Sequence, residues 1–197
     1  LMSPTVVLNS AYWGQADSIY TAALLGCVYG LLRRRDALAC MAFGIAVSFK
    51  AQAMFLSPLL MTLVLLGRLG WRQLAWGPMA FLFGLIPAAI AGRPWRELVT
   101  IYWNQAHTYH SLSMNAPTAY VWLSDRSYEL LAPAGAAWCG ASVMCLVLAM
   151  THVGRRVELS GQRLVQLALV SAIVVPFAMP KMHERYYFPA DQLSLLY

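Results

Sequence analysis

The sequence predicts an all-α protein: a polytopic bundle of transmembrane helices with a short interfacial helix in one outer loop. Three observations support this fold class. Hydrophobic residues make up 60% of the 197 residues and charged residues only 11%, whereas roughly a quarter of a soluble domain is charged. The mean hydropathy is +0.58. Apolar runs alternate with arginine-rich turns along the chain, so we expect a single transmembrane domain over residues 1–197.

The apolar runs are candidate membrane spans. A spanning helix needs about 20 apolar residues, because the hydrocarbon core is ~30 Å thick and each residue rises ~1.5 Å. Several of the runs are shorter than this, and partial spans lie at both ends of the chain. The candidates are residues 18–32, 37–49, 51–66, 74–92, 134–150 and 164–179. Lys50 interrupts the second and third, which predicts either a hairpin whose apex stays within the membrane boundary or a broken helix.

The long loop 93–133 contains a second kind of helix. Its large apolar residues recur at helical spacing, while Arg96, Glu97 and Asn104 face elsewhere. This pattern is typical of a short amphipathic helix in the plane of the membrane interface. The repeating residues are Trp95, Leu98, Val99, Tyr102 and Trp103.

The positive charges predict the orientation of the bundle. Turns 33–36, 68–72 and 155–163 alternate with the other connections, so they share one side, which carries eight Lys and Arg but two acids. The other side carries six of each, so the whole excess of +6 lies on one face. By the positive-inside rule that face is cytoplasmic. No basic patch interleaved with aromatics appears, which argues against nucleic acid as a partner.

The chain termini and the cysteines add two expectations. The chain begins at Leu1 and ends as a further apolar run starts, so we interpret it as an internal fragment of a longer membrane protein. All four cysteines lie inside apolar runs, where thiols behave as small hydrophobes. We assign them no function.

Two isolated charges are candidate site residues on the non-cytoplasmic side. Asp17 lies at the outer mouth of the first span, where it is equally consistent with a helix cap formed by Asp17 or Ser18. Lys50 interrupts an apolar hairpin, and a charge at such depth is costly unless it is paired or lines a wet cavity. The alternative for Lys50 is a side chain that snorkels to the headgroups.

A third charged cluster follows the last full span. Pro180 predicts that this helix ends, and Lys181, His183 and Arg185 come directly after it with Glu184. If these cations converge, they offer donors to an anionic oxygen, with the Arg185 fork suited to phosphate. They are equally consistent with interface anchors, as Tyr186 and Tyr187 beside them would be.

Further polar and aromatic residues could contact a sugar or an acceptor. Tyr12 and Trp13 could stack on a sugar ring, although residues of an interfacial aromatic belt give the same pattern. Gln15 and Gln52 lie beside Asp17 and Lys50 and could bind sugar hydroxyls. His107 and His110 have the spacing of a metal pair, but without a third ligand they are more typical of exposed loop residues.

This set of residues suits one type of reaction. Lysine and arginine would hold a lipid phosphate and stabilise its charge as it leaves, while a carboxylate orients or deprotonates the attacking hydroxyl. That reaction is glycosyl transfer from a lipid phosphate.

The segments "NSAYWGQADSIYTA", "SFKAQAMFLSPLL" and "KMHERYYFPA", in this order, resemble multi-spanning glycosyltransferases of the C type. Within that group the chain resembles bacterial proteins similar to the GPI-anchor mannosyltransferases. The resemblance implies a polyprenyl- or dolichyl-phosphate sugar donor, a periplasmic or lumenal site, and inversion at the anomeric carbon. It also implies a principal acidic residue upstream of anything present here.

The resemblance also implies roles for individual residues. Asp17 would be a second acid that orients acceptor, sugar or a divalent cation. Lys50, His183 and Arg185 would face the donor phosphate, and Glu184 would hold a sugar hydroxyl or position Arg185. We therefore expect a mannosyltransferase in a bacterial inner membrane, with a lipid-linked sugar donor and membrane lipid as partners. The alternatives are an ion- or proton-coupled transporter and a non-catalytic membrane scaffold.

Overall fold

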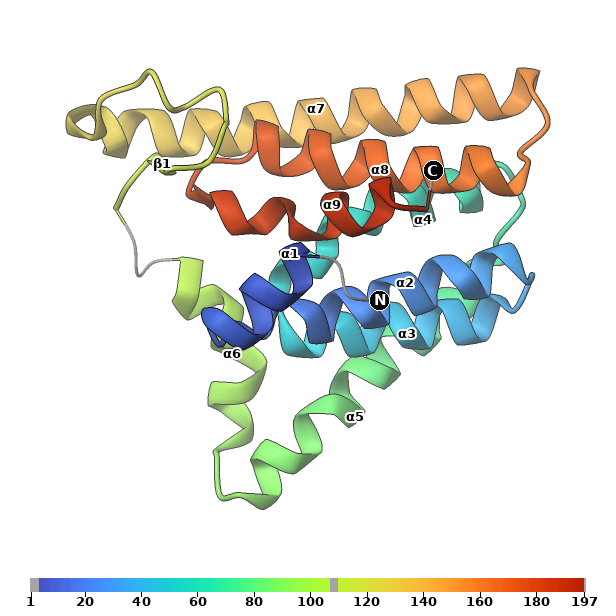
Figure 1. Cartoon of the computed structure of the whole chain (residues 1–197), viewed down its shortest axis with the longest axis horizontal. Helices are drawn as coiled ribbons and strands as arrows, with labels where there is room; N and C mark the ends of the chain where they lie inside the picture. Colours follow the sequence, from blue (N-terminus) through green and yellow to red (C-terminus); the bar gives the residue numbers. More distant parts are fainter. Residues whose placement is uncertain (1–3, 107–109, 197) are drawn as a thin grey trace.

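Helices account for nearly all of the regular structure in the computed structural model, which describes residues 4–106 and 110–196 (Figure 1). The predicted all-α helical bundle is therefore confirmed. The α-helices are α1 (Pro4–Val7), α2 (Asp17–Leu32), α3 (Asp36–Phe49), α4 (Ser57–Leu65), α5 (Trp76–Ile90), α6 (Trp95–Ala106), α7 (Tyr128–Arg156), α8 (Gly161–Ala178) and α9 (Phe188–Ser194).

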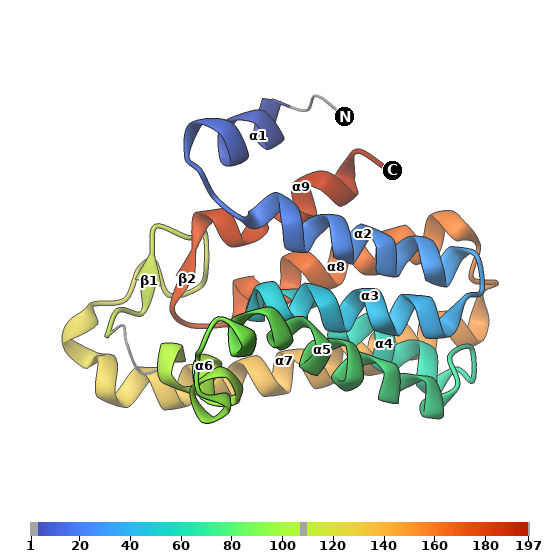
Figure 2. The same ribbon diagram turned by 90° about the horizontal axis from the view of Figure 1, so that it is seen from below.

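Shorter elements connect or extend these helices. A π-helical turn, η1 (Leu8–Tyr12), follows α1. The 3-10 segments are η2 (Ala51–Leu56), η3 (Trp71–Ala75), η4 (Asp125–Ser127) and η5 (Glu184–Tyr187). Strands β1 (Ser113–Met114) and β2 (Met182–His183) pair in parallel (Figure 2).

All six predicted apolar runs are helical over most of their length. Among the residues that the structure describes, three continuous helical segments are long and apolar enough to cross a membrane, namely Trp71–Ile90, Asp125–Arg156 and Gly161–Ala178. The apolar helices Asp17–Leu32, Asp36–Phe49 and Ala51–Leu65 are shorter. Many large apolar side chains on these helices are exposed, including Phe83, Leu130 and Met144, as expected for surfaces that contact lipid.

The chain reverses direction at Lys50, so the hairpin alternative is correct. Lys50 has an extended backbone between α3 and η2 (φ −158°, ψ 130°), and its N–H closes α3 by donating to the Ala46 carbonyl. The residues after Lys50 begin as a 3-10 turn and become α-helical only at Ser57. As a result α4 runs back toward the end of the bundle at which α2 stops (Figure 1).

The main core lies where α2, α3, α4 and α8 meet. Tyr20, Ala39, Leu59 and Ala168 have no exposed area there. Helices α3 and α5 approach so closely that a Cβ on Gly44 would overlap the backbone of Gly77. Small residues at such crossings let backbones pack directly, which is how helices commonly associate in membranes.

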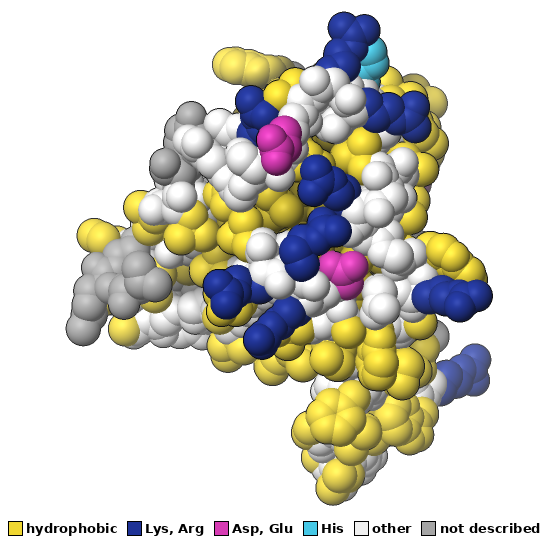
Figure 3. Space-filling view, turned by 90° about the vertical axis from the view of Figure 1, so that its right-hand side faces the viewer, with side chains coloured by type: hydrophobic (Ala, Val, Ile, Leu, Met, Phe, Trp, Pro, Cys, Tyr) yellow, Lys and Arg dark blue, Asp and Glu magenta, His cyan; other side chains and the backbone are white. Residues whose placement is uncertain are grey.

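The three arginine-rich turns gather at one end of the bundle. Figure 3 shows that end, with Lys and Arg side chains spread across it and few acidic side chains among them. Arg34, Arg68 and Ser160, one from each turn, line a common cleft. The alternation of charged turns seen in the sequence therefore corresponds to a real asymmetry between the two ends.

Both boundaries of α7 differ from the sequence prediction. Helix α7 begins at Tyr128 rather than at residue 134, so Pro133 lies inside the helix rather than before it. The same helix continues beyond Met150 to Arg156, because the polar residues after the apolar run remain helical. In the outer loop, α6 coincides with the predicted amphipathic repeat. The Tyr102 hydroxyl at its centre donates to the Val47 carbonyl of α3.

Candidate active site

The candidate site lies at the end of the bundle opposite the arginine-rich turns. Asp17 is the first residue of α2 and Lys50 directly follows the last residue of α3. Because α2 and α3 are antiparallel neighbours, these two residues meet although 33 positions separate them, and they form an ion pair. The Asp17 side chain is completely buried and the Lys50 side chain is 21% exposed. Because the pair is largely removed from water, loss of either charge would leave the other buried without a partner.

Asn9 completes the surroundings of the Asp17 carboxylate. Its amide nitrogen donates to the second carboxylate oxygen at 3.1 Å, and Asn9 itself is buried. The carboxylate does not cap α2: the N-cap is Ala16, which makes no side-chain cap bond. Ser18 is also engaged elsewhere, since the Ser10 hydroxyl donates to it at 2.8 Å. The capping alternative is therefore wrong, and Asp17 is held by two side chains instead.

Arg185 lies beside this pair. It is in η5, and its Nη1 donates to the Gln15 side-chain oxygen at 2.9 Å. Its Nε is buried and has no hydrogen-bond partner within the part of the chain that the structure describes. The guanidinium therefore retains a buried donor, which suits an anionic ligand.

Aromatic rings fill the space around the two cations. The Tyr186 ring lies 5.2 Å from the Lys50 ammonium and 5.9 Å from the Arg185 guanidinium carbon. Tyr20, from α2, lies 5.4 Å from the same ammonium. Distances of about 6 Å or less allow cation–π attraction. One carboxylate and two cations share this cluster, so its formal charge is positive, which favours binding of an anion such as phosphate.

His183 and Glu184 form a more exposed pair next to the buried cluster. His183 Nδ1 lies 3.3 Å from the Glu184 carboxylate, whose side chain is 50% exposed. Partial burial opposes ionisation of Glu184, but hydrogen bonds from its own backbone amide and from His183, with the nearby Arg185 charge, hold its pKa below the usual value. The Lys181 ammonium lies 4.9 Å from the Tyr128 ring.

The lowered pKa of Glu184 predicts an acid-dependent contribution to stability. Because the folded-state pKa is below that of the unfolded chain, the contribution is complete above pH about 4.3 and is lost as the pH falls through the folded-state value. Over that range we expect the melting temperature of Glu184→Gln to fall less than that of the wild type. Glu158→Gln, which removes one carboxylate at the opposite end, is the control. Parallel curves for Glu184→Gln and the wild type would contradict the assignment.

A short pairing between distant segments fixes the charged cluster in place. Ser113 pairs with Met182 and Met114 with His183, and the Lys181 N–H donates to the Leu112 carbonyl at 2.8 Å. The Asp125 carboxylate accepts from the Leu112 N–H at 2.7 Å, so the outer loop is itself tied down. These bonds connect the loop to the segment that presents His183 and Arg185.

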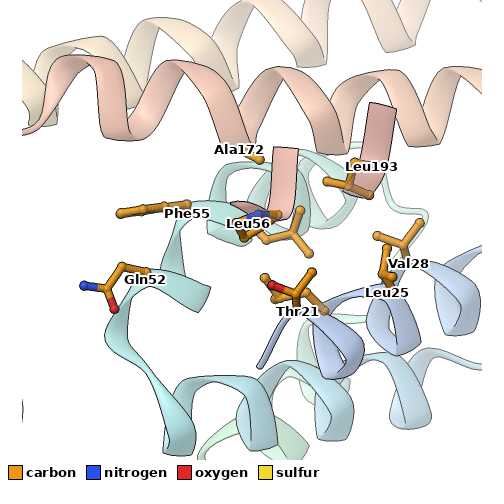
Figure 4. Close-up of a pocket in the computed structure, with 10 residues that line it drawn as sticks. Thr21, Leu25, Val28, Gln52, Phe55, Leu56, Ala172 and Leu193 are labelled. Carbon is orange, nitrogen blue, oxygen red and sulfur yellow. The ribbon is translucent and has the colours of Figure 1, made fainter. Parts of the chain in front are cut away.

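A narrow apolar crevice runs away from the site between α2, η2, α8 and α9 (Figure 4). Gln52 and Phe55 lie at one end of it, and Val28 and Leu193 at the other. Thr21, one turn beyond Asp17, also lines it. Its free volume is about 10 Å³. The crevice follows α2 for about two turns, which is ~10 Å at 1.5 Å per residue.

The structure brings together some of the predicted site residues and separates others. Asp17, Lys50, Gln15 and Arg185 form one cluster. Tyr12 and Trp13 are 80% and 60% exposed and project from the outer turn. Gln52 lines the apolar crevice. His183 and Glu184 flank the cluster from the exposed side.

Sequence reasoning missed Asn9 and Tyr20 as members of this cluster. A signal for each exists in hindsight. Asn9 begins the polar stretch that ends at Asp17, and an amide among apolar neighbours commonly has a buried partner. Tyr20 follows Asp17 by three residues on a helix, so both side chains share a face. Tyr186 was interpreted only as a belt residue, but its ring lies between the two cations.

The structure shows no cluster that resembles a metal centre in residues 4–106 and 110–196: three His, Cys, Asp or Glu side chains nowhere gather there closely enough. Of the two histidines with metal-pair spacing, His107 lies outside the described residues, and the His110 ring packs 5.3 Å from that of Tyr128.

An apolar helical bundle with a buried charged cluster at one end is the architecture of an integral membrane enzyme or transporter. Comparison with protein families distinguishes the two. The chain belongs to glycosyltransferase family 87, whose family model matches residues 1–180. It is thus a membrane glycosyltransferase. Neither the curated proteins nor the solved structures include a match to this chain.

Proposed function

We propose that this protein transfers mannose from a polyprenyl-phosphate donor to an acceptor on the non-cytoplasmic face of a bacterial inner membrane, as a relative of the GPI-anchor mannosyltransferases. The observation that carries the proposal is the pairing of buried Asp17 with Lys50 beside an arginine whose buried Nε has no partner in the described chain. A site of this charge is suited to a phosphate that becomes more negative as the sugar leaves.

In this proposal Arg185 and Lys50 bind the donor phosphate. The acceptor oxygen attacks the anomeric carbon while the bond from that carbon to the phosphate oxygen breaks, so the electron pair remains on the phosphate. Two cations close to that oxygen stabilise the charge it gains. Gln15 orients Arg185 through the hydrogen bond between their side chains. The acceptor proton leaves to a base, as an inverting displacement requires.

Asp17 has a positioning role in this scheme. Its carboxylate is completely buried and is already bound by Lys50 and Asn9, so it holds the lysine in place rather than contacting the sugar. Glu184 is the exposed carboxylate of the cluster, and we assign it to a hydroxyl of the sugar. Tyr12 and Trp13, both exposed next to Gln15, are the aromatic residues available for stacking on the sugar or acceptor.

An apolar crevice next to the site would suit the lipid part of the donor. The crevice of Figure 4 is lined mainly by apolar side chains and begins beside the charged cluster. Its free volume of about 10 Å³ is that of a single water, so α2, α8 and α9 would have to separate for a polyprenyl chain to enter it while the phosphate stays at Arg185. The positive-inside rule assigns the arginine-rich end to the cytoplasm. The site at the other end would then open to the periplasm or exterior.

The class of donor can be tested directly. Membranes that contain the full-length protein are given radiolabelled mannose either as polyprenyl-phosphate-mannose or as a nucleoside-diphosphate-mannose, and the label in lipid and glycan products is counted. We expect transfer from the lipid donor and none from the nucleotide donor when endogenous polyprenyl phosphate has been removed. Transfer from the nucleotide sugar alone would contradict the proposal. Matched reactions with polyprenyl-phosphate-glucose determine whether the enzyme prefers mannose.

A further inference from the structure

A cleft at the arginine-rich end lies far from the candidate active site and has no part in the proposed transfer. It lies at the end of the bundle that Figure 3 shows, and it has a volume of about 70 Å³. A water needs roughly 10–15 Å³ on a comparable measure, so the cleft has room for a group of several heavy atoms. All three arginine-rich turns contribute to its walls, and we propose that it binds the phosphate headgroup of an anionic phospholipid.

One wall of the cleft is polar and basic. Arg34, Arg68 and Ser160 line it. Neither arginine side chain has a hydrogen-bond or ion-pair partner among residues 4–106 and 110–196, and the acids at this end, Asp36 and Glu158, do not line the cleft. Two unpaired arginines that line a common cleft can bind phosphate oxygens in the forked geometry typical of their side chains.

The backbone at Arg34 supports a role for its side chain. Arg34 follows the end of α2 in the left-handed region, with φ 56°. Glycine is the usual residue at this point of a helix end, and Gly67 adopts the same conformation in the neighbouring turn, with φ 66°. An arginine at this position is strained where a glycine would not be. Such strain commonly accompanies a functional constraint.

The leucines of the cleft favour a lipid over free phosphate. Leu32, Leu63 and Leu159 line the cleft; Leu32 is 39% exposed, whereas Leu63 is buried. A soluble phosphate would leave the exposed part of Leu32 in water, whereas the first carbons of an acyl chain would cover it. Anionic lipids are concentrated at the cytoplasmic surface of membranes, and basic residues near that surface attract them.

The test is native mass spectrometry of the full-length protein in detergent, titrated with phosphatidylglycerol. Arg34→Gln/Arg68→Gln is compared with Arg155→Gln/Arg156→Gln, which removes the same charge from the same end but outside the cleft. We expect the first variant to bind the lipid about tenfold more weakly, as loss of charge-assisted hydrogen bonds implies. We expect the second to stay within about twofold of wild type, as for surface charges that make no specific contact. Equal loss in both variants, or no loss in either, would overturn the proposal.

Two further measurements distinguish lipid binding in the cleft from loss of folding and from binding of free phosphate. Arg34→Gly removes the guanidinium but suits the left-handed backbone, so we expect a melting temperature no lower than wild type together with weaker lipid binding. Unchanged lipid binding in this variant would overturn the proposal independently of the double variants. Glycerol 3-phosphate presents the headgroup chemistry without acyl chains. Binding of it as tight as that of phosphatidylglycerol would overturn the assignment to a lipid.

Discussion

Lys50→Met is expected to lower the free energy of unfolding by about 3 kcal/mol and to abolish sugar transfer. Removal of one partner from a buried ion pair leaves an uncompensated charge, which typically costs ~3–5 kcal/mol. Here Asp17 would retain only the Asn9 amide, and the partial exposure of Lys50 places the effect toward the lower limit. Methionine preserves most of the apolar stem of the lysine. Thermal unfolding of the full-length protein in detergent measures the first effect and the mannose assay the second.

The double variant Asp17→Asn/Lys50→Met separates stability from function. It removes both charges, so no uncompensated carboxylate remains, and we expect it to regain most of the stability lost by the single variant. Transfer should stay absent because a cation near the donor phosphate is still missing. If Lys50→Met unfolds at the wild-type temperature, the pair does not stabilise the bundle as inferred. If the double variant regains transfer as well as stability, Lys50 has no role in the reaction.

Gly44→Ala is expected to be among the most destabilising single-methyl changes in the bundle. The new Cβ would overlap the Gly77 backbone, which cannot move without separating α3 from α5. Overpacking of a close-packed interior costs ~1–3 kcal/mol, and a clash with backbone rather than a flexible side chain places this variant at or above the upper limit. Reduced yield of folded protein and a lower melting temperature would show the effect.

Gly140→Ala is the matched control. Gly140 lies in α7 and an added Cβ there meets nothing within 4 Å. Alanine is a better helix former than glycine by roughly 1 kcal/mol, so this substitution should leave the protein equally or more stable. Both variants add one methyl group to a helical glycine. We expect Gly44→Ala to lower the free energy of unfolding and Gly140→Ala to leave it unchanged or raise it. Similar destabilisation by both would show that helix backbone effects, and not the crossing of α3 and α5, determine the result.

Much of the fold could be predicted from the sequence, because the lengths of the apolar runs and the positions of the charges between them indicate where membrane helices begin and end. Pro180 correctly marked the end of α8, which stops at Ala178. Pro133 misled in the same way, because α7 begins with Tyr128 after Ser127 and continues through the proline. Pro133 is the sixth residue of α7, where proline removes the helical hydrogen bond to the Glu129 carbonyl without ending the helix. The two-residue strands β1 and β2 could not be predicted, since their pairing depends on contacts between segments far apart in sequence.

The candidate site was predictable in part. Asp17 and Lys50 stood out because each interrupts apolar sequence, and the reversal of the chain at Lys50 is what brings them together. Their direct pairing could not be predicted, because it depends on the packing of α2 against α3. The sequence left open whether Lys181 converges with Arg185; the Lys181 ammonium lies 4.9 Å from the Tyr128 ring, and the Lys181 backbone is left-handed, with φ 65°. The burial of Asn9 depends on the turn of η1, which the sequence analysis did not predict.

The most direct test of the glycosyl-transfer site is the rate of mannose transfer from polyprenyl-phosphate-mannose by membranes that contain the full-length protein, wild type against Arg185→Ala. Arg126→Ala is the control, because Arg126 belongs to η4 in the outer loop, whereas the Gln15 side-chain oxygen accepts its hydrogen bond from Arg185. Loss of a preorganised donor to a developing negative charge typically lowers the rate about 100-fold or more. We therefore predict a fall of that size for Arg185→Ala and wild-type transfer for Arg126→Ala. Equal rates in all three proteins would contradict the assignment of this cluster as the donor phosphate site.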